Sequence, residues 1–111
     1  MEKGIVKKLE NQNDFLYFHI EANASVVYLL DEISAAIDDY EEGLSYPEKN
    51  INYETFVPKR VSFNVGDGTT YAIVIFNKDQ IDLILFKNNS KFDAFLGLMK
   101  EKFSYSNGES L

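Results

Sequence analysis

The alternation of apolar and polar residues predicts a strand over residues 14–21. Alternate side chains of a strand point to opposite faces of the sheet. One face of this segment is apolar, and the other carries aromatic residues and the single histidine of the chain: Phe15, Tyr17 and His19. We therefore expect a strand whose two faces differ in character.

A second block, residues 59–87, predicts three antiparallel strands in a meander. Residues 56–65 alternate, and Gly66-Asp67-Gly68-Thr69 is a turn sequence because Gly and Asp accept positive φ. Residues 71–76 are apolar on both faces, as in a central strand. After a second turn at residues 77–80, the strand over residues 81–86 has one polar break, Asp82.

Apolar residues at steps of three and four predict a helix over residues 24–42. Either Asn23 or Ser25 can cap its start, and Gly43 suits the end. The apolar row of this helix is Val26, Leu30, Ile33, Ile37 and Tyr40. A second helix is expected from Ser90, with Asp93 completing an approximate capping box. Its apolar face would be Phe92, Phe95, Leu96, Met99 and Phe103.

The resulting order, β-α-β-β-β-α, predicts an α+β fold in which an antiparallel meander sheet has two helices packed on one face. We expect a single domain over residues 1–111, with a helical turn or an edge strand in residues 1–13 and a frayed tail at residues 104–111. The other face of the sheet would be partly open, with Tyr71, Ile73 and Ile75 or their alternates outward. Such a face permits a homodimer.

Composition narrows the class of protein. The 111 residues include no Cys and one His, which excludes disulfides, thiolate zinc sites and multi-histidine metal sites. Apolar runs reach only about six residues, far below the roughly 20 that a membrane span needs. The first residues lack the apolar core of a signal peptide, so we expect a cytoplasmic protein.

The charge is placed unevenly along the chain. Its formal net charge is −7, but residues 1–56 carry −8 and residues 57–111 carry +1. No Lys or Arg occurs between Lys8 and Lys49, a window of 40 residues with ten acids. One-sign potential of this kind repels phosphates, which argues against nucleic acid or an anionic membrane as the direct ligand. It permits a basic protein as the partner.

The sequence offers little support for an enzyme. His19 lies in a predicted strand among aromatic residues, which favours a packed or half-exposed side chain over a catalytic base. Neighbouring acids on a helix diverge by about 100°, so pairs such as Asp38 and Asp39 cannot close on one cation. Gly66-Asp67-Gly68 leads into a strand and carries a negative charge, so it is a hairpin turn and not a phosphate loop. We expect no metal and no cofactor.

The strongest candidate site combines the acidic helix with the long loop that follows it. Tyrosine gives large rigid contact area plus a hydroxyl, and carboxylates can bind arginines of a basic partner. Acids late in a helix also oppose its dipole, so local stability does not explain them. The candidate partner-binding residues are Asp31, Asp38, Asp39, Tyr40, Glu41, Glu42, Tyr46, Glu48, Tyr53 and Glu54.

These features predict a small inhibitor or immunity-type protein that docks onto a basic, nucleic-acid-binding partner. In charge style alone the chain resembles nuclease-immunity proteins and DNA mimics, without any family motif. Lys outnumbers Arg ten to one, a bias typical of AT-rich genomes such as those of low-GC bacteria, their phages and mobile elements. Two alternatives stay open. The first is an assembly module that self-associates through its sheet and has an acidic face only for solubility. The second is an enzyme or small-molecule binder with a pocket between the helix over residues 24–42 and the sheet.

Overall fold

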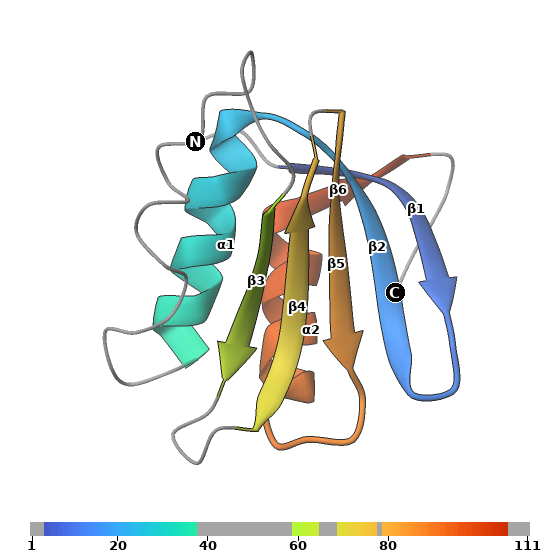
Figure 1. Ribbon diagram of the computed structural model, residues 1–111, viewed down its shortest axis with the longest axis vertical. Coiled ribbons are helices and arrows are strands. Elements are labelled where there is room, and N and C mark those ends of the chain that lie inside the picture. Colours follow the sequence, from blue (N-terminus) through green and yellow to red (C-terminus); the bar gives the residue numbers. More distant parts are fainter. Residues whose placement is uncertain (1–3, 38–58, 65–68, 78, 107–111) are drawn as a thin grey trace.

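The computed structural model describes residues 4–37, 59–64, 69–77 and 79–106. Within these residues two helices accompany one mixed sheet whose strand order is β3-β4-β5-β2-β1-β6 (Figure 1). In chain order the elements are β1 (Gly4–Asn11), β2 (Phe15–Glu21), α1 (Ala24–Ile37), β3 (Lys59–Asn64), β4 (Thr70–Phe76), β5 (Gln80–Phe86), α2 (Phe92–Lys102) and β6 (Phe103–Tyr105).

The predicted α+β class is confirmed, and so are the strand over residues 14–21, the three-stranded meander and the second helix. The helix predicted over residues 24–42 is confirmed as far as Ile37, and residues 38–42 of that prediction lie outside the described residues. The strand count and the purely antiparallel sheet were wrong. Residues 4–11 form β1, which pairs with β2, and β6 adds on the far side of β1 in parallel. Part of the tail expected to fray is therefore a strand. The remainder of that tail, residues 107–111, lies outside the described residues.

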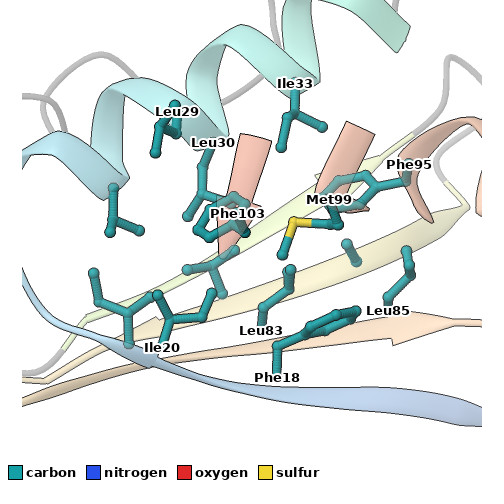
Figure 2. Packing of buried hydrophobic residues seen from close by; sticks show 14 of the residues in the cluster. Phe18, Ile20, Leu29, Leu30, Ile33, Leu83, Leu85, Phe95, Met99 and Phe103 are labelled. Carbon is teal, nitrogen blue, oxygen red and sulfur yellow. The ribbon is translucent and has the colours of Figure 1, made fainter. Parts of the chain in front are cut away.

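The core lies between the helices and one face of the sheet. In Figure 2, Leu30 and Ile33 of α1 and Met99 of α2 point toward Phe18 of β2 and Leu83 of β5. All five side chains are fully buried. Burial of such side chains contributes roughly 1.5–3 kcal/mol each, so this layer is the main source of stability.

The two helices start differently. Asn23 caps α1 as expected, because its Oδ1 accepts a hydrogen bond from the backbone N–H of Val26 at 3.2 Å. The capping box predicted at Ser90 is wrong. Helix α2 begins at Phe92, and its N-cap Lys91 makes no side-chain capping bond. The Oδ1 of Asn89 instead accepts a hydrogen bond from the backbone N–H of Lys91, which orders the turn before the helix.

Two irregularities in strand pairing decide which residues face the core. In β1 the register shifts between Val6 and Lys8, which turns Glu10 to the face away from the helices. The pairing of β3 with β4 shifts between Phe63 and Asn64. Tyr71 is consequently buried in the core instead of pointing outward, with its ring centroid 6.0 Å from those of both Phe63 and Phe95.

We call the sheet face opposite the core the open face. Figure 1 looks onto it, with α2 behind the sheet. No helix within the described residues packs against this face. Its side chains include Phe15, Tyr17, His19, Ile73, Ile75, Asp82, Ile84 and Phe86.

Candidate functional site

Most of the predicted partner-binding residues lie outside the described part of the chain. Asp31 belongs to α1, and its side chain is not described. The other nine lie outside the described residues: Asp38, Asp39, Tyr40, Glu41, Glu42, Tyr46, Glu48, Tyr53 and Glu54. The structure therefore places the start of the acidic segment on α1 and leaves the grouping of its members a prediction.

The described acids of the lysine-free window do not share one surface. Glu10 and Glu21 lie on strands β1 and β2, whereas Glu32 lies on α1, on the other side of the sheet. Glu32 also forms an exposed ion pair with Lys102 of α2, with Nζ to Oε2 at 3.2 Å. Exposed pairs of this kind contribute about 0–1 kcal/mol. The described acids of this window therefore do not form one acidic surface.

The structure brings a different set of polar residues together on the open face. His19 of β2 lies opposite Lys8 of β1 on one side and opposite Asp82 of β5 on the other. We call His19, Glu10, Gln80 and Asp82 the His19 network. Sequence reasoning singled out His19 and Asp82 separately but did not predict that they meet.

One ring nitrogen of His19 binds a carboxylate. Nε2 lies 2.5 Å from Oε2 of Glu10, and about a third of the Glu10 side chain is exposed. The hydrogen bond from His19 lowers the pKa of Glu10 from its usual value of 4.5, because it favours the ionised carboxylate. Only the shifted register of β1 gives Glu10 this position.

The other ring nitrogen faces two groups at once. Nδ1 of His19 lies 2.9 Å from Nε2 of Gln80 and 3.3 Å from Oδ1 of Asp82. The same Gln80 amide donates to Oδ1 of Asp82 at 2.5 Å. Asp82 is buried, with 8% of its surface exposed, so these bonds satisfy a carboxylate that is otherwise costly to bury.

Tyr17 covers the imidazole. The two rings stack with centroids 4.3 Å apart and planes 15° from parallel. Burial, followed by the negative charge of Asp82 and a hydrogen bond to it, raises the pKa of Tyr17 above its usual value of 10.0. The imidazole therefore has a ring stacked on its face and a carboxylate near each of its nitrogens.

The polar contacts of His19 are all made within the network. Each nitrogen of His19 already has a polar partner, so neither is poised against a nucleophile within the described residues. Glu10 and Asp82 bind opposite ends of the ring, so they cannot close on one cation with it. No group of three or more metal-binding side chains occurs among the described residues. His19 is packed and half-buried, as the sequence predicted.

The rest of the open face is largely apolar. Ile73 and Ile84 lie opposite each other on β4 and β5, and both are half-buried. Phe15 packs edge-on against Phe86, with ring centroids 6.5 Å apart. Exposed polar residues border this area on β3, at Arg60, Ser62 and Asn64. An apolar centre with a polar rim is the usual anatomy of a protein interface.

No helix within the described residues is long and apolar enough to cross a membrane. Comparisons with models of protein families, with curated proteins and with solved structures found no match.

Proposed function

We propose that this chain is a small inhibitor or immunity-type protein that binds a basic partner through the acidic surface of residues 31–54. The observation that carries the proposal is the complete absence of Lys and Arg between residues 8 and 49. A helix that is acidic only for solubility usually mixes both signs, because pairs at i and i+4 stabilise it. A segment of one sign gives up those pairs, and binding a cationic surface compensates for the loss.

The roles of the residues follow from their chemistry. Carboxylates from Asp31 to Glu42 would attract the partner over several ångströms and accept hydrogen bonds from its arginines. Tyr40, Tyr46 and Tyr53 would bury their rings in the contact as anchors. A line of carboxylates also resembles a line of phosphates in sign, so we propose a cytoplasmic, nucleic-acid-binding protein as the partner.

Capture from host lysate tests this function. The chain is immobilised, partners are eluted, and the proteins retained at about 50 mM and about 500 mM salt are identified by mass spectrometry. We expect a basic protein that binds at low salt and is lost at high salt, because salt screens exposed charges beyond about 3–10 Å. Capture of a partner whose binding ignores salt would contradict the proposal.

A second candidate function is self-association as an assembly module, and the apolar centre of the open face favours it. Light scattering distinguishes the two, since a dimer whose mass ignores salt supports assembly. Ile73→Lys should dissolve that dimer, because it puts a charge among half-buried isoleucines. Ala36→Lys adds the same charge at an exposed position of α1 and should leave the dimer intact.

A further inference from the structure

The Nδ1 atom of His19 lies against both a hydrogen-bond donor and a hydrogen-bond acceptor. The donor is the Gln80 amide at 2.9 Å, and the acceptor is Oδ1 of Asp82 at 3.3 Å. A ring nitrogen can satisfy only one of them in each protonation state. We infer that the His19 network is a proton-operated switch on the open face, in which Nδ1 exchanges Gln80 for Asp82 when the ring gains a proton.

In the neutral state the ring carries its proton on Nε2, and this N–H donates a hydrogen bond to Glu10. Nδ1 then has a free lone pair and accepts a hydrogen bond from the Gln80 amide. The second hydrogen of that amide goes to Asp82. Every polar group of the network has a partner in this state, and the Gln80 side chain of β5 links the ring on β2 to Asp82.

In the charged state both ring nitrogens donate. Nε2 stays on Glu10, and Nδ1–H turns to Oδ1 of Asp82, which a movement of about 0.5 Å brings to the usual length of a charge-assisted bond. The Gln80 amide loses its acceptor on the ring and keeps only Asp82. The added proton removes one of the two net negative charges of the network, so the charge and the hydrogen bonding of the open face change together.

Among the described residues, few other charged side chains lie near the ring. From β1, Lys8 lies directly opposite His19, and from its own strand Tyr17 stacks on it. On the far side of Asp82, β4 presents the apolar Ile75, and Arg60 of β3 lies one strand further away. Within the described part of the chain, the ionisable neighbours that face the switch are therefore Glu10, Lys8, Tyr17 and Asp82, all on β1, β2 and β5.

Because the chain has one histidine, NMR can follow the switch without assignment ambiguity. Long-range ¹H–¹⁵N spectra of the full chain are recorded from about pH 4.5 to 8.5. We expect the neutral ring to carry its proton on Nε2, and the side-chain amide signals of Gln80 to move with the same midpoint as the ring. A proton on Nδ1 in the neutral state, or Gln80 signals that stay constant, would overturn the inference.

Two variants should move the ring's titration in opposite directions. Gln80→Leu removes the partner of the neutral ring and should raise the midpoint, whereas Asp82→Asn removes the partner of the charged ring and should lower it. Each shift should be about half a pH unit or more, a change of about threefold in proton affinity. Glu21→Gln, at the exposed end of the same strand, should shift it far less. Shifts of the midpoint in the same direction for both network variants would reject the switch. If a variant does not fold, the proton position and the Gln80 signals in the wild-type spectra test the switch alone.

Discussion

Gly4 in β1 packs closely against the ring of Phe103. A β-carbon at this position would overlap the ring of Phe103, which is itself buried with 2% of its surface exposed. Gly4→Ala should therefore destabilise the fold by about 1–3 kcal/mol, the usual cost of overpacking. Urea unfolding measures this directly.

Gly97 provides the matched control for that substitution. It lies in α2, is exposed, and has nothing within 4 Å of the added β-carbon. Gly97→Ala should stabilise the chain by about 0.5–1 kcal/mol through helix propensity. Equal effects of the two substitutions would show that the contact between Gly4 and Phe103 is absent in solution.

Glu10 should contribute to acid sensitivity. Its hydrogen bond with His19 lowers its folded-state pKa below the usual 4.5, so the stabilisation is present above pH 4.5 and is lost as pH falls through the lowered folded value. Glu10→Gln removes this proton linkage. The variant's free energy of unfolding should consequently fall less steeply than that of the wild type below pH 4.5, and identical slopes would contradict the assignment.

Tyr105 should contribute to the loss of stability at alkaline pH. Burial raises its pKa above the usual 10.0, and its hydroxyl donates to the carbonyl of Met99 at 3.1 Å. The folded state resists ionisation, so stability is full below pH 10 and decreases as pH rises above it. Tyr105→Phe should lose about 1 kcal/mol at neutral pH and then show a flatter decline above pH 10. Unfolding curves at pH 7 and pH 11 test both parts.

Some single residues also show where the sequence pattern cannot predict the face of the sheet on which a side chain lies. Alternation placed His19 and Asp82 on their strands correctly, since both strands are regular. Alternation could not predict which face of the sheet carries Glu10 or Tyr71. The orientation of each side chain depends on a register shift, which moves it to the opposite face. Such shifts depend on how two strands pair, which the period of one strand does not contain.

At the scale of elements, β6 depends on its first residue. Phe103 fills the space above Gly4, and its neighbour Ser104 is exposed. Phe103→Ala should destabilise the fold by about 3–5 kcal/mol through loss of a buried ring. Ser104→Ala, one residue along the same strand, should change stability by less than about 0.5 kcal/mol. Loss of similar size in both would mean that backbone pairing, not the ring, holds β6.

Helices and strands with a regular spacing of apolar residues could be predicted from the sequence, and those without such spacing could not. The row of Val26, Leu30, Ile33 and Ile37 defined α1, and all four are buried. Strand β1 has two lysines and a bulge in the middle, so its alternation is broken. Strand β6 has only three residues, and its parallel pairing joins the two ends of the described chain. A local pattern carries no information about that contact.

At the scale of the whole molecule, some acidic residues of the lysine-free window have partners within the chain, and others belong to the proposed acidic surface. Before α1, Glu10 and Glu21 lie on the sheet and Asp14 lies in the turn between β1 and β2, and Glu10 is bound by His19. Glu32 is paired with Lys102. The sequence could show that charge is uneven, but it could not show which acids find internal partners, because those contacts join distant segments. The proposed acidic surface therefore rests on residues 31–54, where the tyrosines also occur.

The most direct test of the account compares two double variants with the same change in net charge. Asp38→Lys with Glu42→Lys reverses charge inside the proposed surface, and Asp79→Lys with Glu101→Lys reverses it at exposed positions elsewhere. The first should weaken capture of the basic partner by well over tenfold with a nearly unchanged melting temperature, because opposite charges steer the encounter. The second should weaken capture only slightly. Equal capture by the two variants would contradict the claim that this segment binds a basic protein.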